Sequence, residues 1–244
     1  MKDNNEKLSE YKFSIIIPVL HEANTINSLI EHLYNQESDE SYEIIVVDGD
    51  PNRETINIIH YKEVTSIIAG QGRARQMNAG AGIARGEILI FLHADTQLPV
   101  DALNQISSAM EQKHYIGGAF DLGIRSDSFF FKTIAYFASA RSRLTRIPYG
   151  DQAIFIRKDY FNRIGGYREI PLMEDVELMQ RIKKTGDKIC ILSDCVRTST
   201  RRWEKEGIVY CTLRNWIISS LYFMGISPNR LARFYRSGRN AYED

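Results

Sequence analysis

The sequence is poor in cysteine, proline and glycine. Its 244 residues include 3 Cys, 6 Pro and 16 Gly. The cysteines are odd in number and lack Cys-x-x-Cys spacing, which argues against a disulfide framework or structural zinc and favours a reducing compartment. With 43% hydrophobic and 25% charged residues, the composition excludes a collagen-like, low-complexity or wholly disordered chain.

The chain also lacks net charge, because 31 Lys and Arg balance 31 Asp and Glu. A dedicated nucleic-acid-binding protein is usually basic, so we expect no nucleic-acid partner. The charge is nevertheless uneven, since residues 195–244 contain 9 bases and 4 acids. This basic end fits contact with an anionic substrate or a membrane surface, and it equally fits a solvated helix face.

Long apolar runs are missing as well. Residues 1–12 show no signal-peptide pattern, and the apolar stretches 129–140 and 208–226 are interrupted by Lys132 and Arg214. A membrane-spanning helix needs ~20 apolar residues with few charges. We therefore expect a cytoplasmic protein that at most lies on the inner face of the membrane. The aromatic residues of 208–226 and the arginines at 230, 233 and 236 would make that peripheral contact through C-terminal helices.

The first half of the chain alternates β-branched runs with helical patterns. Strands are predicted at 13–18, 43–48, 64–69 and 87–92, and helices at 22–34 and 71–84. Continuous apolar runs indicate strands that are buried on both faces, as in a parallel sheet. The pattern predicts an α/β fold with an open, mostly parallel sheet flanked by helices, and it places ligands at the carboxyl ends of the strands.

The second half is less regular and more helical. Its predicted elements are strands at 117–121 and 152–157, helices at 129–143, 174–184 and from 204 onward, and two short apolar segments near Ile189 and Val196. The sequence has no internal repeat and no linker. We therefore expect a single domain over residues 1–244.

Two strand ends carry residues that suit phosphate chemistry. Asp95, in His93-Ala94-Asp95, could hold a hard divalent cation that bridges substrate phosphates, or it could cap a helix starting near Pro99. The glycines and arginines of 70–78 enter a helix and suit a pyrophosphate. A dinucleotide fingerprint belongs instead to the first strand–helix turn, which has no glycine here.

Two pairs of acids allow both a functional and a structural interpretation. Asp48 and Asp50 could accept hydrogen bonds from a base or a sugar, or they could form an Asx turn before Pro51. Glu174 and Asp175 open a helix, where the helix dipole favours acids whatever their function. The histidines at 21, 32, 60 and 114 have no metal-like spacing, so we expect them to be surface or packing residues.

Six segments together resemble a family 2 glycosyltransferase of the GT-A fold, and they occur in the order of that family. They are Ile-Ile-Ile-Pro-Val-Leu-His-Glu (15–22), Ile-Val-Val-Asp-Gly (45–49), Gly-Arg-Ala-Arg-Gln-Met-Asn-Ala-Gly (72–80), Phe-Leu-His-Ala-Asp-Thr (91–96), Met-Glu-Asp-Val-Glu-Leu (173–178) and Arg-Arg-Trp (201–203). More narrowly, three segments resemble a soluble bacterial subgroup of the family: Gly-Arg-Ala-Arg-Gln-Met-Asn (72–78), Ile-Pro-Tyr-Gly-Asp-Gln (147–152) and Pro-Leu-Met-Glu-Asp-Val-Glu (171–177). The resemblance implies a Rossmann-like nucleotide-sugar-binding half at 13–122. An acceptor-binding half with C-terminal helices would follow at 123–244.

The resemblance also implies roles for individual residues. The nucleotide sugar would be bound by Pro18, Val19, Glu22, Asp48, Arg73, Asn78, His93, Asp95 and Trp203. Among these, Asp48 would bond the base, usually uracil, and Asp95 would bind Mg²⁺ or Mn²⁺. Asp175 would be the general base and Arg202 would meet the leaving diphosphate. The acceptor would be bound by Gly150, Asp151 and Glu174.

The implied activity is an inverting, metal-dependent, non-processive transfer of a sugar. The donor would be a nucleotide-diphosphate sugar, expected to be a UDP-sugar, and the acceptor a hydroxyl group, with a lipid-linked molecule as one candidate. His93 replaces the first acid of the family's Asp-x-Asp motif, and Arg-Arg-Trp lacks the Gln-x-x-Arg-Trp of processive synthases. The alternatives are a catalytically silent nucleotide-sugar-binding protein and a nucleotidyltransferase.

Overall fold

The computed structural model describes residues 10–112 and 114–240, with side chains up to residue 235. Its strands are β1 (Tyr11–Val19), β2 (Tyr42–Asp48), β3 (Thr65–Ile68), β4 (Gly86–Phe91), β5 (Thr96–Gln97), β6 (Tyr115–Ile124), β7 (Ile154–Arg157) and β8 (Lys188–Thr198). Its helices are α1 (Ile26–Tyr34), α2 (Arg73–Ile83), α3 (Ala102–Glu111), α4 (Phe129–Thr145), α5 (Lys158–Arg163), α6 (Glu174–Thr185), α7 (Arg201–Glu206), α8 (Ile208–Phe223) and α9 (Pro228–Asn240). Two 3₁₀ turns, η1 (Ile56–Ile58) and η2 (Gly150–Gln152), complete the described elements.

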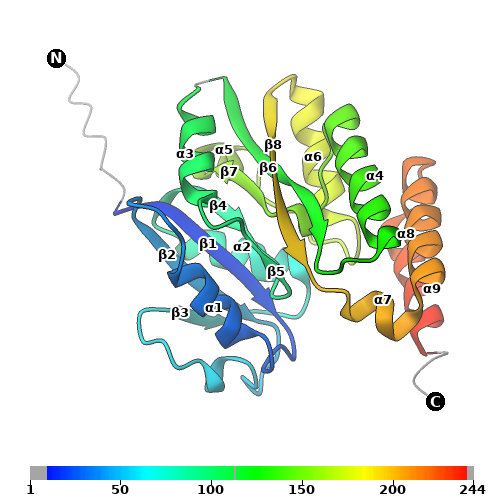
Figure 1. Cartoon of the computed structure of the whole chain (residues 1–244), viewed down its shortest axis with the longest axis horizontal. Helices are drawn as coiled ribbons and strands as arrows, with labels where there is room; N and C mark the ends of the chain where they lie inside the picture. The colour runs from blue at the N-terminus through cyan, green and yellow to red at the C-terminus, as the bar shows by residue number, and fades with distance from the viewer. Residues whose placement is uncertain (1–9, 113, 241–244) are drawn as a thin grey trace.

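All eight described strands belong to one sheet, in the order β3-β2-β1-β4-β7-β6-β8-β5 (Figure 1). Strands β3, β2, β1 and β4 are parallel neighbours, and β8 runs parallel to β6. Strand β7 is antiparallel to β4 and β6, and β5 is antiparallel to β8. The predicted α/β fold with an open, mostly parallel sheet is therefore confirmed.

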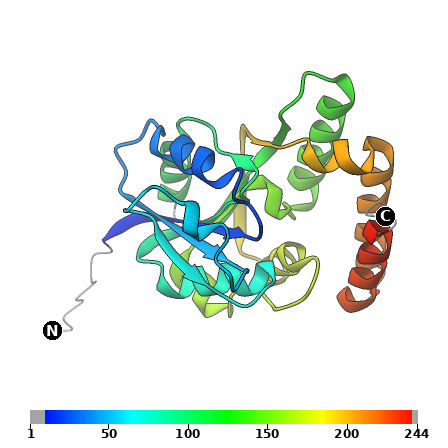
Figure 2. The ribbon, with the colours of Figure 1, turned by 90° about the horizontal axis from the view of Figure 1, so that it is seen from below.

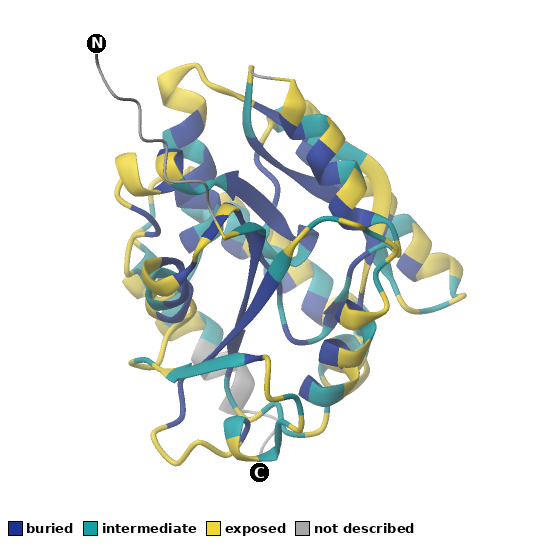
Figure 3. Cartoon of the chain, turned by 90° about the vertical axis from the view of Figure 1, so that its left-hand side faces the viewer, coloured by how far each residue is buried: buried dark blue, intermediate teal, exposed yellow. Residues whose placement is uncertain are grey.

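Helices cover both faces of this sheet because its central strands are apolar on both sides. In β1, Ile15 and Ile17 pack into a core with α1 and α3, whereas Ile16 packs into a second core with α2, α5 and α6. Successive side chains of a strand point to opposite faces, which explains this division. Figure 3 shows the strands largely buried and the outer faces of the helices exposed.

Helix α4 and the C-terminal helices α7, α8 and α9 gather at one end of the molecule (Figures 1 and 2). Helix α4 lies against β6, where the hydroxyl of Ser139 accepts a hydrogen bond of 2.9 Å from the N–H of Leu122. None of the described helices is long and apolar enough to cross a membrane. The division of the chain at residue 122 stays a prediction.

The structure corrects three details of the predicted elements. The two apolar segments near Ile189 and Val196 form the single strand β8. The polar residues 193–194 between them do not end the strand, because the pairing with β6 shifts register there and continues beyond them. Helix α1 begins at Ile26 rather than at residue 22. Asp95 caps no helix near Pro99, since β5 follows it directly and α3 begins at Ala102 with Asp101 as its N-cap.

Candidate active site

A long-range strand pairing brings the segment 199–203 beside the strand-end motif 93–95. Thr96 pairs with Thr198, 102 residues away in sequence. The N–H of Ser199 donates a hydrogen bond of 3.0 Å to the carbonyl oxygen of Asp95. The loop before α7 is therefore fixed at the carboxyl end of the central strands, where an α/β sheet binds its ligands.

The turn η2 joins this motif to the start of α6. The N–H of Gly150 donates a hydrogen bond of 2.6 Å to Oδ2 of Asp175. A methyl group in place of the Gly150 hydrogen would lie 3.0 Å from Nε2 of His93 and 3.4 Å from Oδ2 of Asp175. His93, Gly150 and Asp175 thus meet at one point, which three separate segments of the chain supply.

Two buried glutamine side chains, which the sequence analysis did not single out, hold these loops in place. Gln152 donates a hydrogen bond of 2.8 Å to the carbonyl of Phe120 and accepts one of 2.6 Å from Ser142. Gln76 donates to the carbonyl oxygens of Val19 and Val47, at 2.7 and 2.8 Å. Gln76 lies in the segment 72–80 and Gln152 in the segment 147–152. The resemblance of these segments to the family was the one sign in the sequence that the two glutamines matter.

The electrostatics of the site depend on burial and on a mixture of charges. Burial, followed by the charge of Arg73, lowers the pKa of His93 to about 3, so its imidazole is neutral near pH 7. Burial raises the pKa of Asp151 to about 6, against the charge of Arg141 and with a contribution from Asp175. A positive charge placed near Asp151 would lower the pKa of its carboxyl group and favour the ionised form.

Glu174 and Asp175 stand in the first turn of α6 and differ in environment. Glu174 is buried, and burial raises its pKa to about 7, with a further rise from the charge of Asp175. Asp175 is half-buried, and its oxygens accept hydrogen bonds from the N–H groups of Gly150 and Val176. These two backbone donors fix the direction of the Asp175 carboxylate.

We expect Glu174→Gln to stabilise the fold at about pH 8 by ~1–3 kcal/mol and to change it little at acid pH. The folded-state pKa of about 7 lies above the ordinary value of 4.5. Between these two pKa values the folded chain keeps the Glu174 proton, whereas the unfolded chain loses it. The free energy of unfolding therefore falls as the pH rises from about 4.5 to about 7. Glutamine removes the buried charge and keeps the shape. Denaturant titrations at the two pH values check this, and an equal gain at both would point to packing rather than charge.

The positively charged side of the site comes from α2 and α7. Arg73 is the first residue of α2, and its charge acts on both His93 and Glu174. Burial lowers the pKa of Arg202, but neighbouring groups led by Tyr235 and including Asp95 raise it overall. Two arginines therefore lie around the strand-end motif, where they could meet an anionic group.

Trp203, the residue after Arg202, has an apolar and a polar contact surface. Its ring packs edge-to-face against Phe131 of α4, with ring centroids 5.6 Å apart. Its indole nitrogen is buried and has no hydrogen-bond partner among the described residues. An indole N–H usually finds a partner when it is buried. This nitrogen is enclosed by the protein, so the predicted contact of Trp203 with the donor stays a prediction.

The residues predicted to line the nucleotide cleft are placed at the ends of β1 and β2. Pro18 and Val19 are buried in β1, with the Val19 side chain in the core. Asp48 is fully buried and its two oxygens accept hydrogen bonds from the N–H groups of Asp50 and Ile56, at 2.9 and 3.3 Å. The Asx turn considered from the sequence is thus present, and a base contact by Asp48 stays a prediction.

Glu22 and Asn78 have contacts within the protein that the sequence did not reveal. The carboxylate of Glu22 forms an ion pair of 2.8 Å with Arg201, which connects the loop after β1 to α7. The amide of Asn78 bonds the N–H and the carbonyl of Tyr167, at 2.9 and 2.8 Å. Burial, followed by the charges of Asp175 and Glu174, raises the pKa of Tyr167. Asn78 is therefore connected to the α6 acids through Tyr167, and its predicted contact with the donor stays a prediction.

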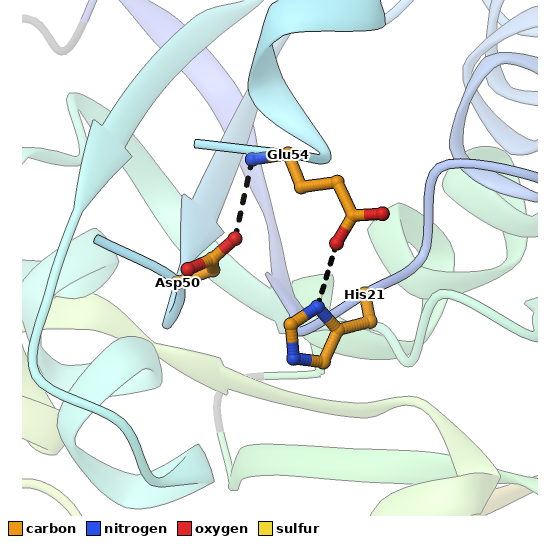
Figure 4. A group of neighbouring side chains, drawn as sticks. All are labelled: His21, Asp50 and Glu54. Carbon is orange, nitrogen blue, oxygen red and sulfur yellow. Dashed lines mark hydrogen bonds and ion pairs between the residues drawn. The ribbon is translucent and has the colours of Figure 1, made fainter. Parts of the chain in front are cut away.

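Figure 4 shows His21, Asp50 and Glu54, whose possible ligand atoms all lie within 4.8 Å of one another. The histidine prediction from spacing did not anticipate this group, because residues 21 and 50 follow different strands. These three residues are already hydrogen-bonded to one another. Nδ1 of His21 lies 2.8 Å from Oε2 of Glu54, and the carboxylate of Asp50 accepts a hydrogen bond from the backbone N–H of Glu54. Among the described residues, Asp95 belongs to no such group. A cation at Asp95 would therefore take its other ligands from water or a bound phosphate.

A sequence model described as "Glycosyl transferase family 2" matches residues 14–168 of this chain. The PGL/p-HBAD biosynthesis glycosyltransferase of Mycobacterium bovis is 30% identical over 166 residues, which cover 64% of this chain and 62% of that protein. The undecaprenyl-phosphate 4-deoxy-4-formamido-L-arabinose transferase of Proteus mirabilis is 26% identical over 157 residues, 60% of this chain and 48% of that protein. The chain thus spans about half to three fifths of the length of these relatives.

Solved structures share the fold at low sequence identity. The mannosyltransferase PcManGT from Pyrobaculum calidifontis, in complex with GDP-Man and Mn²⁺, superimposes with a TM-score of 0.62 at 19% identity, covering 78% of this chain and 56% of that one. TarS 1–349 from S. aureus, in complex with UDP-GlcNAc, gives a TM-score of 0.61 at 15% identity, covering 77% and 58%. These likenesses support the GT-A type of sheet.

Proposed function

The chain belongs to glycosyl transferase family 2, and from this premise we propose that it moves a sugar from a nucleotide-diphosphate sugar to a hydroxyl acceptor. UDP is the nucleotide we expect in the donor. The reaction would be a single, non-processive displacement that inverts the anomeric centre. The bond from the anomeric carbon to the diphosphate breaks, the bond to the acceptor oxygen forms, and the acceptor proton passes to a base.

One observation supports this proposal above the others. At Gly150, the strand-end motif and the first turn of α6 meet, because a Cβ atom on Gly150 would lie 3.0 Å from Nε2 of His93 and 3.4 Å from Oδ2 of Asp175. A group that holds the donor and a group that accepts a proton must both reach the reacting atoms. The fold brings these two candidates together from positions 82 residues apart in sequence.

Each residue of the site has a role in this scheme. Arg202 and Arg73 would offset the negative charge that grows on the departing diphosphate, which is usually the largest contribution to catalysis. Asp175 would accept the acceptor proton on a carboxylate lone pair that the backbone N–H groups leave free. The neutral His93 could donate a hydrogen bond to the donor without adding charge. Gly150, Asp151 and Glu174 would border the acceptor.

The donor set at Asp95 fits a hard divalent cation such as Mg²⁺ or Mn²⁺. Its carboxylate is half-buried and, among the described residues, accepts one long hydrogen bond of 3.3 Å, from the Thr96 hydroxyl, so lone pairs remain for a ligand. Carboxylate oxygen together with substrate phosphate is a common way to bind Mg²⁺. We propose that Asp95 holds this cation, which would neutralise charge on the diphosphate. The neighbour in complex with GDP-Man and Mn²⁺ supports the use of a divalent cation.

The acceptor is proposed to be lipid-linked. The name of the Proteus mirabilis relative contains undecaprenyl phosphate, a lipid, and that relative matches 60% of this chain. A lipid-linked acceptor would require the enzyme to approach a membrane. The C-terminal helices, with their aromatic residues and arginines, would make this peripheral contact.

A panel of UDP- and GDP-sugars with and without Mn²⁺ tests the proposed function. We expect metal-dependent release of a nucleoside diphosphate and, with an accepted hydroxyl compound, a product of inverted anomeric configuration by NMR. A metal-dependent thermal shift with UDP but no turnover across the panel would favour the silent binding protein. Release of pyrophosphate from a nucleoside triphosphate would favour the nucleotidyltransferase.

A further inference from the structure

Helix α4 packs on the sheet but exposes most of its large apolar side chains to solvent. The side chains it buries are Phe131, Ala135, Ser139 and Ser142, of which three are small. Its exposed side chains include Phe129, Phe130, Tyr136, Phe137 and Leu144, with exposed fractions between 56% and 87%. These positions recur at helical spacing along one outward face.

Helix α8 shows the same inversion. It buries Cys211, Arg214 and Ile218, two of them polar or charged. Its outward face presents Val209, Leu213, Trp216, Ile217 and Phe223, between 49% and 67% exposed. The outward spacings of four, three, one and six residues keep these side chains on one stripe of the helix. A soluble monomer rarely leaves apolar stripes of this size in water, so both faces require a cover.

The charge around the stripes indicates what covers them. Residues 129–145 and 207–240 contain no Asp or Glu and eight Lys or Arg. Arg214 is buried and pairs with Glu206, and Arg143 pairs with Asp121, so these two add no free positive charge to the surface. Lys132 and Arg230 are exposed. A second copy of this chain would place like charges opposite each other across a symmetric interface, which costs free energy. An anionic lipid surface would complement them, at ~1 kcal/mol for each basic residue near the surface.

We infer that the outward stripes of α4 and α8 form one membrane-binding face that docks on an anionic bilayer surface. This face is defined by Phe129, Phe130, Tyr136, Phe137 and Leu144 of α4 and Val209, Leu213, Trp216, Ile217 and Phe223 of α8. Figures 1 and 2 both place these two helices at the same end of the molecule. The α4 stripe was not expected from the sequence, where only the C-terminal helices were considered.

The helices that carry the membrane-binding face contact the candidate active site through other residues. The hydroxyl of Tyr149 donates a hydrogen bond of 3.0 Å to Ser219 of α8, and the guanidinium of Arg141 in α4 lies 3.3 Å above the Tyr149 ring. Tyr149 precedes Gly150, which bonds Asp175. Docking through this face would therefore set the acceptor side of the site beside the lipid surface. This consequence, presentation of a lipid-linked acceptor to Asp175, rests on the proposed function.

Vesicle flotation and tryptophan fluorescence test the inference. The chain has two tryptophans, so Trp203→Phe leaves Trp216 as the single reporter. Vesicles of phosphatidylcholine with phosphatidylglycerol should co-float with the full chain at low salt and shift the Trp216 emission to the blue. Phe130→Ser combined with Leu213→Ser should lower the partition coefficient about tenfold or more, because both side chains leave the apolar phase.

A matched control replaces exposed apolar residues elsewhere. Ile83 and Val100 are 43% and 54% exposed and lie outside α4 and α8. Ile83→Ser with Val100→Ser should leave flotation unchanged, and circular dichroism should show both double variants folded. Absence of flotation of the wild-type chain, or equal loss in both double variants, would overturn the inference. A concentration-dependent dimer in sedimentation velocity that only Phe130→Ser and Leu213→Ser abolish, without flotation, would assign the face to a second copy instead.

The experiment separates this inference from the proposed function. Binding of UDP with Mn²⁺ is measured by calorimetry without vesicles and does not require the membrane-binding face. A chain that binds UDP but does not float would retain the proposed function and lose the inference. A chain that floats but neither binds nor turns over any nucleotide sugar would do the reverse.

Discussion

Replacing Asp175 by asparagine is expected to lower turnover by ~10²-fold or more while leaving donor affinity unchanged. Asparagine keeps one oxygen, which can accept the hydrogen bond from the Gly150 N–H that ties η2 to α6. It loses the acceptor for the N–H of Val176, the next residue, which is a local bond in the first turn of α6. The change removes the carboxylate charge and with it the ability to accept the acceptor proton. Initial rates with a UDP-sugar, together with calorimetric affinity for UDP, measure the two parts separately.

Asp159 supplies a matched control for the Asp175 variant. It also stands in the first turn of a helix, α5, and accepts a hydrogen bond of 2.7 Å from the next N–H, that of Tyr160. Asp159→Asn therefore repeats the loss of a first-turn charge away from the site and should keep wild-type turnover. If Asp175→Asn were fully active while Glu174→Gln lost activity, the base would be Glu174, whose raised pKa of about 7 suits proton transfer near neutral pH.

Replacing Asp95 by alanine is expected to lower the affinity for UDP in the presence of Mn²⁺ by about 100-fold, equal to ~2.7 kcal/mol. Asp95 belongs to no group of three or more metal-binding side chains within the described residues, so few other protein ligands could replace it. Affinity in the presence of a chelator should change little, because the cation is then absent in both proteins. Calorimetric titrations under the two conditions give both values.

The control for the Asp95 variant is Asp127→Ala, which removes an exposed acid outside the site and should leave both affinities unchanged. His93→Asp should be tolerated, since it restores the first acid of the family's motif. Equal UDP–Mn²⁺ affinity in Asp95→Ala and the wild-type chain would remove Asp95 from the proposed metal site. The metal dependence would then have to come from another group.

The sequence predicted the first half of the fold closely because the signals there are local. The runs at 43–48 and 87–92 correspond to β2 and β4 within one residue at each end. Buried parallel strands need continuous apolar residues, and neighbours in the chain are enough to show that. Strand β8 shows the limit of this reasoning, because two polar residues in a register shift made one strand look like two separate segments.

The sequence by itself determined the strand–helix alternation, the family resemblance and the kinds of side chain available to the site. Only the tertiary structure decided which of them meet: Thr96 with Thr198, His93 with Gly150, and Asp175 with the Gly150 N–H. The inverted helices α4 and α8 also required it, since their sequences do not state which face the protein covers. Periodicity is set by residues two to four positions apart, whereas these contacts depend on packing between elements that lie far apart in the chain.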